Sequence, residues 1–295
     1  MFQMKKICII GGDFRMICLG RQLEESGIFV NYFGFEKMTS VSPVYSDLEN
    51  ALDECNCALL PVPLSRDGIH VFMPMSDNKL ELNGELSRLL KGMRIYTSNA
   101  EMLIKSGDYD SDQIFDYFDR EPVKIENAVL TAEGAVCEAI KNSDYSLYMS
   151  KCLVAGWGRI GKPLCRLLRA FGADVTVSAR RSDDLTWIRA EGFTPVHTNE
   201  IINSGRYKFI FNTVPHIIFT KDILENTAAD ALIIDLASMP GGVDKKACEE
   251  LNIKLIHALS IPGKTAPQAA AAVLKKSLIE INETTRRNTS WKNQL

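Results

Sequence analysis

The stretch KCLVAGWGRIGKPLCRLLRAFGADVTVSARRSDD, residues 151–184, decides the fold of the second half of the chain. Its first apolar run predicts a buried strand, and Gly156, Gly158 and Gly161 then follow the pattern G-x-G-x-x-G. Residues 163–171 carry a helical pattern, and a second apolar run arrives about 20 residues after the turn. This order of strand, glycine turn, helix and strand is typical of a unit that binds a dinucleotide.

The glycines of this turn have separate roles. The first permits a tight turn, the second lets the backbone approach a pyrophosphate, and the third lets helix and strand pack closely. The start of the following helix offers free N–H groups to the phosphates, and Pro163 suits that first turn. The triplet alone is a weak signal, and its flanking elements turn it into a prediction. We expect coenzyme contacts from Gly156, Trp157, Gly158, Arg159, Ile160 and Gly161.

The end of the second strand indicates which coenzyme is bound. An Asp or Glu usually accepts hydrogen bonds from the adenosine ribose at this place. Here the strand ends at Ser178, and Arg180 and Arg181 follow. A carboxylate would repel the 2′-phosphate of NADP, whereas the planar guanidinium groups of arginine match phosphate oxygens. We therefore predict NADP over NAD; the alternative is that one or both arginines are solvated surface residues.

Three later loops rich in Gly and Pro also follow predicted strands, at residues 212–215, 235–242 and 258–264. Ligands of open α/β sheets lie outside the carboxyl ends of the strands. Ordinary turn chemistry explains one such loop more easily than three. The first loop is expected at the coenzyme ribose, the second at the nicotinamide ribose and the third at the nicotinamide. The expected contacts are Thr213, Val214, Pro215, Ala237, Ser260 and Pro262.

Strand and helix patterns alternate in the first half of the chain as well, which predicts an α/β fold of two doubly wound parallel-sheet domains, the C-terminal one of the Rossmann type. We expect a flavodoxin-like substrate domain over residues 1–130 and a coenzyme domain over 131–265, with a bridging helix capped at its start by Thr131. Residues 68–74 are expected to form a short extra strand, and 106–120 a lid or short helix. The last helix, residues 266–285, is expected to pack on the first domain, before a flexible tail over 286–295.

Composition narrows the class of function. The chain has 295 residues, 46% of them hydrophobic and 24% charged, with a net charge of −3. Nothing in this balance favours a nucleic-acid partner, and no apolar run approaches the roughly 20 residues of a membrane span. The N-terminal apolar run ends in Gly-Gly-Asp, which indicates a first strand and not a signal peptide. The eight cysteines and four histidines are dispersed, so we expect reduced thiols in a cytoplasm and no metal site.

Four further residues are candidates for chemistry. Asp13, in GGDFR, is either a helix cap or a catalytic carboxylate. Arg15 in the first turn opposes the helix dipole, which indicates that it faces an anion. Glu133, expected in the first turn of the bridging helix, is at least as easily structural as catalytic. His216 is either a proton-transfer group or a partly buried structural residue.

With these motifs in view, the chain resembles the A subunits of dipicolinate synthase from spore-forming bacteria. The resemblance rests on GGDFR, DREPVKIENAVLTAEGA, GWGRIGKPL with VTVSAR, FNTVP, IIDLASMPGGVD and ALSIPGKTAP, which appear in the family's order over nearly the whole chain. Ile261 stands where the family is expected to have leucine, and Trp157 and His257 are less usual. The wider relatives by architecture are the 2-hydroxyacid dehydrogenases and adenosylhomocysteine hydrolase.

The resemblance implies NAD(P)-dependent oxidation of a dihydrodipicolinate to dipicolinic acid in the mother-cell cytoplasm during sporulation. It also implies a B subunit with a flavoprotein-like fold, and a homo-oligomer is compatible with it. Two substrate carboxylates need positive or hydroxyl partners, for which the candidates are Arg15, Thr131, Ser238 and Lys264. The catalytic candidates are Glu133, His216 and Asp13. The alternatives are another NADP-dependent oxidoreductase of this fold and a non-catalytic subunit that binds NADP for regulation.

Overall fold

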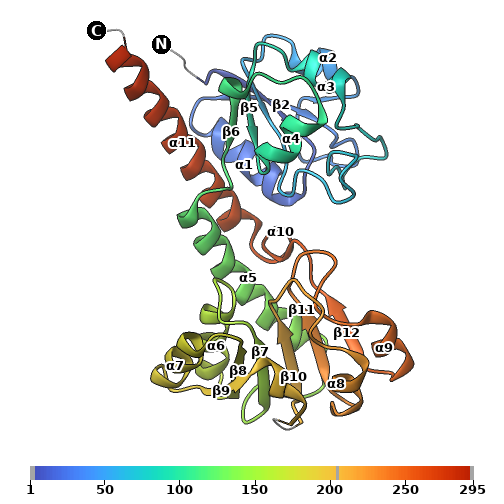
Figure 1. Ribbon diagram of the computed structural model, residues 1–295. Coiled ribbons are helices and arrows are strands. Elements are labelled where there is room, and N and C mark those ends of the chain that lie inside the picture. The colour runs from blue at the N-terminus through green and yellow to red at the C-terminus, as the bar shows by residue number, and fades with distance from the viewer. Residues whose placement is uncertain (1–3, 204–205, 293–295) are drawn as a thin grey trace. The chain divides into compact units, whose positions relative to one another are not determined.

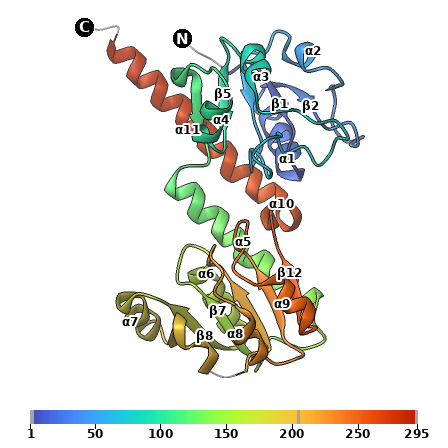
Figure 2. The same ribbon diagram turned by 45° about the vertical axis from the view of Figure 1, so that its right-hand side comes forward.

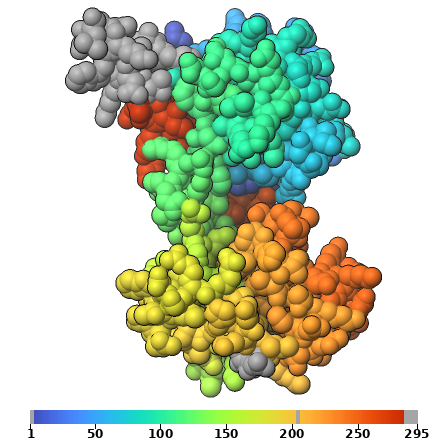
Figure 3. Space-filling view, viewed as in Figure 1, coloured from blue at the N-terminus to red at the C-terminus, as the bar shows by residue number. Residues whose placement is uncertain are grey.

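The computed structural model describes residues 4–203 and 206–292, which fall into two compact units (Figure 1). Unit 1 comprises residues 1–124 and 266–295, and unit 2 comprises 125–265. Figure 2 shows that each unit is a sheet flanked by helices, and Figure 3 shows their surfaces in space-filling form. Both units are α/β with parallel sheets, so the predicted fold class is confirmed. Among the helices of the described ranges, none combines the length and hydropathy needed to cross a membrane.

Unit 1 is built on a six-stranded parallel sheet of order β3-β2-β1-β4-β5-β6. Without the two-residue edge strand β3, the order is the 2-1-3-4-5 of flavodoxin-like folds. The middle strand KICII is buried along almost its whole length, as expected for a parallel sheet covered on both faces. The strands are β1 (Lys6–Ile10), β2 (Phe29–Phe33), β3 (Val44–Tyr45), β4 (Cys57–Leu59), β5 (Arg94–Thr97) and β6 (Ile114–Asp116).

Helices cover both faces of this sheet, and the last helix of the chain belongs to one of those layers. The helices are α1 (Phe14–Glu24), α2 (Leu48–Leu52), α3 (Gly84–Leu89), α4 (Ala100–Ser106), the 3-10 turn η1 (Ser111–Gln113) and α11 (Pro267–Lys292). Ala271, Leu274 and Leu278 of α11 share one buried cluster with Leu19 and Leu23 of α1.

Unit 2 has a second six-stranded parallel sheet, of order β12-β11-β10-β7-β8-β9. The order reverses at β7, so the strand ends on either side of β7 frame the crevice in which ligands of such sheets bind. The strands are β7 (Lys151–Ala155), β8 (Asp174–Ala179), β9 (Thr194–His197), β10 (Phe209–Asn212), β11 (Leu232–Asp235) and β12 (Lys254–His257).

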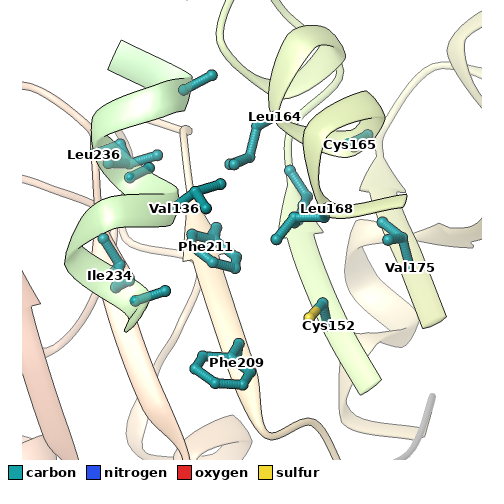
Figure 4. Close-up of a cluster of buried hydrophobic side chains, with 14 of the residues drawn as sticks. Val136, Cys152, Leu164, Cys165, Leu168, Val175, Phe209, Phe211, Ile234 and Leu236 are labelled. Carbon is teal, nitrogen blue, oxygen red and sulfur yellow. The ribbon is translucent and has the colours of Figure 1, made fainter. Parts of the chain in front are cut away.

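The core of unit 2 lies on both faces of its sheet. Figure 4 shows one cluster, in which Leu164 and Leu168 of α6 and Val136 of α5 pack over Phe209 and Phe211 of β10. The helices are α5 (Glu121–Lys141), which begins in unit 1, α6 (Gly161–Ala170), α7 (Ser182–Ala190), the 3-10 helix η2 (Thr198–Asn203), α8 (Lys221–Glu225), α9 (Lys245–Glu250) and α10 (Ile261–Thr265).

The predicted start of the bridging helix is wrong. The helix begins at Glu121, so Thr131 and Glu133 lie in its middle and not at a cap or in a first turn. Thr131 Oγ1 donates to the carbonyl of Asn127, 2.8 Å away, which is the bond of a mid-helix threonine to the preceding turn. Pro122 explains the earlier start, because proline is well tolerated in the first turn of a helix.

Smaller expectations also differ from the structure. Residues 68–74 form only isolated bridges, Ser65 with Val71 and His70 with Glu81, and no named strand. The region 106–120, expected to be a lid or short helix, contains η1 and the edge strand β6. The units divide at 124/125, where the sequence indicated 130/131. The last helix continues through residues 286–292 of the expected tail, and residues 293–295 lie outside the described ranges.

Candidate functional site

The turn between β7 and α6 has the geometry that a pyrophosphate needs. Gly156 has φ of 105°, and a Cβ there would lie 2.3 Å from Thr213 Oγ1. A Cβ on Gly161 would lie 2.0 Å from the carbonyl oxygen of Gly156. A Cβ on Gly158 would meet no atom of the described residues within 4 Å. The first and third glycines are therefore required by packing, whereas the second leaves room for a ligand to approach the backbone.

The first turn of α6 is suited to an anion. Ile160 is its N-cap residue and makes no side-chain cap hydrogen bond, and the first turn has no acidic side chain. The N–H groups of a helix start carry a partial positive charge and need acceptors. A phosphate group would supply those acceptors, as it does in other glycine turns of this kind.

A cavity of about 680 Å³ opens at the carboxyl ends of β7, β8 and β10. This size suits part of a dinucleotide, because small-molecule sites are commonly about 300–1,000 Å³. The predicted residues among its lining are Gly156, Trp157, Gly158, Ser178, Arg180, Arg181, Val214, Pro215 and His216. The sequence motifs did not point to Ala179, Asp184, Thr198, Asn199, Ile217, Ile218, Thr220 and Ile223, which also line it.

Two buried polar atoms at this cavity lack a hydrogen-bond partner among the described residues. They are Ser178 Oγ and Trp157 Nε1, on side chains of residues that are 1% and 7% exposed. The Trp157 ring packs edge-on against Phe193, with ring centroids 5.9 Å apart. Unpartnered buried polar atoms are uncommon in folded proteins and favour a site that a ligand completes. A rotation about the Cα–Cβ bond turns a serine hydroxyl at low cost, so Ser178 can reach a ligand oxygen.

The two arginines after β8 are exposed at the edge of the cavity. Arg180 makes no ion pair within the described ranges, and Arg181 Nη2 lies 3.3 Å from Asp183 Oδ2. Both side chains of that pair are about three-quarters exposed, so the pair contributes little. Asp184 is the one carboxylate on the described lining, which also carries the two guanidinium groups. The local charge therefore favours an anion.

A buried Asn–Asp pair holds the two loops beyond β10 and β11. Asn212 Nδ2 donates to Asp235 Oδ1 at 2.7 Å and to the carbonyl of Val214 at 3.0 Å. Asp235 accepts from the N–H of Ala237 at 3.1 Å and of Gly242 at 2.8 Å. Removal of one partner would leave several buried polar groups unsatisfied. Asn212 and Asp235 therefore fix the loops after β10 and β11, a role that no motif in the sequence indicated.

The residues expected at the nicotinamide end do not line this cavity, and Ala237 and Pro262 among them are buried. Ser238 and Lys264 are exposed, and Ser260 has φ of 55°. A Cβ on Gly134 would lie 1.9 Å from Ile261 Cγ2 and 2.7 Å from Thr265 Oγ1. This close approach seats α10 on α5, so the segment with exposed Glu133 adjoins the helix that carries Lys264.

Asp13 and Arg15 lie in unit 1 and contact each other. Asp13 Oδ1 accepts from the Arg15 N–H at 3.1 Å and from Arg15 Nε at 2.9 Å. Arg15 Nη2 donates to Asp13 Oδ2 at 2.7 Å and to the carbonyl of Val62 at 2.5 Å. The two residues are 8% and 3% exposed. Asp13 is therefore the helix cap, and its carboxylate is an anion that Arg15 faces.

Six of the eight cysteines are buried, and Cys55 and Cys137 are partly exposed. All eight are free thiols. Burial raises the pKa of Cys57 and of Cys152 to about 12, and the pKa of Cys248 to about 11. A thiol with a raised pKa is a poor nucleophile and a poor metal ligand. Within residues 4–203 and 206–292, no group of three or more metal-ligating side chains gathers.

Comparisons with known proteins show the family to which the chain belongs. The family model for the N-terminal domain of the dipicolinate synthase A subunit matches residues 6–131. The dipicolinate synthase A subunit of Bacillus subtilis is 31% identical over 286 residues, which cover 94% of this chain and 96% of that protein. The crystal structure of the dipicolinate synthase A subunit from Bacillus halodurans has a TM-score of 0.79 at 26% identity, covering 95% of this chain and 98% of that one.

A more distant match shows the fold alone. The transhydrogenase structure from Sinorhizobium meliloti has a TM-score of 0.61 at 14% identity, covering 95% of this chain and 94% of that one.

Proposed function

The chain belongs to the family of dipicolinate synthase A subunits, and from this premise we propose that it oxidises a dihydrodipicolinate to dipicolinate with NADP. In this reaction the ring gives a hydride to NADP and a proton to the protein or solvent, and the products are the pyridine and NADPH. The observation that carries the proposal is the glycine turn between β7 and α6, open at Gly158 and followed by an arginine pair where an acid usually stands.

The residues of unit 2 fit a nicotinamide dinucleotide. Gly158 and the first turn of α6 would hold the pyrophosphate, and Val214 and Pro215 would form a wall of the adenosine part. When bound, the nicotinamide supplies the hydride acceptor. The buried Asn212–Asp235 pair holds the surrounding loops in place before the coenzyme arrives, which lowers the cost of binding.

The preference for NADP rests on three residues at the end of β8. Arg180 and Arg181 supply positive charge, and Ser178 supplies a hydroxyl without a partner in the described part of the chain. A hydrogen bond to a charged group contributes about 1.5–3 kcal/mol. A carboxylate at the same place would oppose the 2′-phosphate by charge repulsion.

A double variant tests this preference. R180A/R181A should raise the Kd for NADP by about tenfold to a hundredfold, because two charge-assisted contacts are lost. The Kd for NAD should change by less than about threefold. Isothermal titration calorimetry on the full chain measures both constants. A wild-type protein that prefers NAD, with the same preference after the double substitution, contradicts the proposed coenzyme.

The two substrate carboxylates need partners, and the candidates differ in whether their side chains already make hydrogen bonds within the protein. Lys264 and Ser238 are exposed and make the strongest pair. Arg15 already serves Asp13 and Val62, and the Thr131 hydroxyl already donates to Asn127. We propose that Lys264 and Ser238 bind carboxylate, with Arg15 and Thr131 as lesser candidates.

For the proton acceptor we retain Glu133. It is exposed on α5 in the segment that adjoins α10 through Gly134. Asp13 is a poorer candidate, because its oxygens accept from three groups of Arg15. Aromatisation of the ring drives the reaction, so orientation and water exclusion matter more than a strong base.

A direct assay separates this function from two others. The chain is incubated with NADP and the hydroxy-tetrahydrodipicolinate pool, alone and with the B subunit that the family name implies. The proposed function predicts pyridine absorbance that rises together with NADPH. NADPH turnover only with other carbonyl or imine substrates would indicate a different oxidoreductase. NADP binding without turnover, even with the B subunit, would indicate a regulatory subunit.

We further propose that the protein acts with its B subunit in the mother-cell cytoplasm during sporulation, as the family membership suggests.

A further inference from the structure

His216 lies at the end of the cavity where the adenosine half of the coenzyme is expected. It lines the same 680 Å³ cavity as Ser178, Arg180 and Arg181. None of Ser238, Ser260 and Lys264, which were expected at the nicotinamide end, lines that cavity. His216 is therefore grouped with the residues expected at the adenosine half of the coenzyme and not with those expected at the nicotinamide.

The strand order explains the grouping. β7 pairs with β8 on one side and with β10 on the other. The carboxyl ends of three adjacent parallel strands meet at one edge of the sheet, so the loop after β10 faces the residues after β8 across the glycine turn. His216 is in that loop, four residues beyond the end of β10 at Asn212.

The loop that carries His216 is held at both ends. Before it, the Val214 N–H donates to Asn212 Oδ1 at 3.1 Å, and Thr213 Oγ1 donates to the carbonyl of Ala155 at 2.8 Å. After it, the N–H groups of Ile218 and Phe219 donate to the carbonyl of Gly242 at 3.0 and 3.1 Å. Few backbone conformations are open to a short segment anchored in this way, so the position of His216 is largely preorganised.

The His216 side chain is available to a ligand. The residue is exposed, and its ring makes no hydrogen bond or ion pair with the described residues. The charged groups that line the cavity with it are Arg180, Arg181 and Asp184. A neutral imidazole can donate one N–H and a protonated one can donate two, so either form can bond a phosphate oxygen.

We infer that His216 binds the 2′-phosphate of NADP together with Arg180 and Arg181, and so acts in coenzyme selection instead of proton transfer. The inference rests on the proposed use of NADP. It replaces the catalytic role that the sequence left open for this residue.

The test uses probes that separate the two ends of the coenzyme. Adenosine 2′,5′-bisphosphate carries the 2′-phosphate without the nicotinamide, and NAD carries the nicotinamide without the 2′-phosphate. Calorimetry gives the Kd of each, and of NADP, for the wild-type chain and for H216A. H216A should bind the bisphosphate and NADP about five- to tenfold more weakly and NAD within about twofold, as for loss of one charge-assisted bond.

I217A is the matched control, because Ile217 lines the same cavity from the same loop and is 40% exposed. I217A should weaken the binding of NAD and of NADP equally, because it removes an apolar contact and no partner of the phosphate. Thermal unfolding of each variant shows that it is folded.

The outcomes are distinct. H216A that binds the bisphosphate as the wild type does overturns this inference and leaves the proposed function intact. If H216A weakens the binding of NAD and of NADP equally, the inference is also overturned, because the lost contact is then not one to the 2′-phosphate. A wild-type chain that binds NAD and NADP equally overturns the proposed coenzyme and this inference together.

Discussion

In both units the first central strand of the sheet leads through a glycine turn into a helix, and the strand orders are the same. Unit 1 runs β3-β2-β1-β4-β5-β6, and unit 2, taken from its other edge, runs β9-β8-β7-β10-β11-β12. The turn of unit 1 is filled by the chain itself. A Cβ on Gly12 would lie 2.2 Å from Met16 Cγ, and the Asp13 carboxylate caps α1.

The turn of unit 2 is open at its second glycine. A Cβ on Gly158 would meet no atom of the described ranges within 4 Å, and no side chain caps α6. Both helix starts need an acceptor for their N–H groups. In unit 1 the protein supplies a carboxylate, whereas in unit 2 a coenzyme phosphate would supply it. Two sheets with the same strand order therefore carry different turns, and the residues of each turn decide whether a phosphate could enter it.

The largest expected effect comes from removal of the internal carboxylate in unit 1. Asp13→Ala leaves the Arg15 guanidinium buried without its ion-pair partner and uncaps α1. We expect a loss of about 3–5 kcal/mol in the free energy of unfolding. Urea unfolding followed by circular dichroism measures it.

Asp183→Ala is the control, because its pair with Arg181 is exposed. That variant should lie within about 0.5 kcal/mol of the wild type. Equal stability of the two variants would show that the Asp13–Arg15 pair does not hold unit 1 together.

The next effect comes from making unit 2 resemble unit 1. Gly158→Asp places a carboxylate beside the open start of α6, where it would repel the pyrophosphate. We expect NADP binding to weaken by about a hundredfold or more, about 2.7 kcal/mol. The free energy of unfolding should be nearly unchanged, because a Cβ at Gly158 meets no neighbouring atom of the described residues.

Gly158→Asn has nearly the same shape without the charge and serves as the matched variant. It should weaken binding clearly less than Gly158→Asp does. If the two variants bind NADP equally poorly, the loss of binding is caused by the bulk of the side chain and not by its charge.

A smaller contrast concerns two buried serines, one in each unit, each 1% exposed. Ser277 Oγ of unit 1 donates to the Tyr117 carbonyl at 2.7 Å, whereas Ser178 Oγ of unit 2 has no partner among the described residues. Ser277→Ala should lower the free energy of unfolding by about 1 kcal/mol. Ser178→Ala should leave it unchanged or slightly higher, and should weaken NADP binding about fivefold. Loss of stability in Ser178→Ala, with unchanged NADP binding, would assign this hydroxyl to the fold.

Most of the fold could be predicted because the central strands are continuous apolar runs, such as KICII and the start of 151–184. The edge strands were harder. β9 contains Pro195 and is half exposed, and β6 ends in the acidic segment that looked like a lid. The start of α5 was missed because Thr131 matches a cap as well as a mid-helix position, and only the backbone path distinguishes them.

The site was predictable where local geometry decides it and less so where distant residues meet. The glycine roles in the β7–α6 turn follow from the spacing of the glycines together with the strand before them and the helix after them. Asp13 and Arg15 were each interpreted correctly in part, yet their contact with each other was not foreseen. The Asn212–Asp235 bond joins strand ends 23 residues apart, and its formation depends on the register of β10 and β11.

The thiols should show the smallest difference between the units. Cys57 lies in the middle of the first sheet and Cys152 in the second, and burial raises the pKa of both from 9.0 to about 12. Because the pKa is higher in the folded chain than in the unfolded chain, these thiols do not lower the free energy of unfolding below pH 9. Above pH 9 the free energy of unfolding decreases as the pH rises toward 12. At about pH 9, pulse alkylation by iodoacetamide should therefore leave both unlabelled in the native chain and label both in guanidinium chloride, with glutathione as the reference thiol. Selective labelling of Cys152 in the native chain would mean that the sheet of unit 2 unfolds locally more often than the sheet of unit 1. The difference between the units would then include the core of unit 2 as well as its turn.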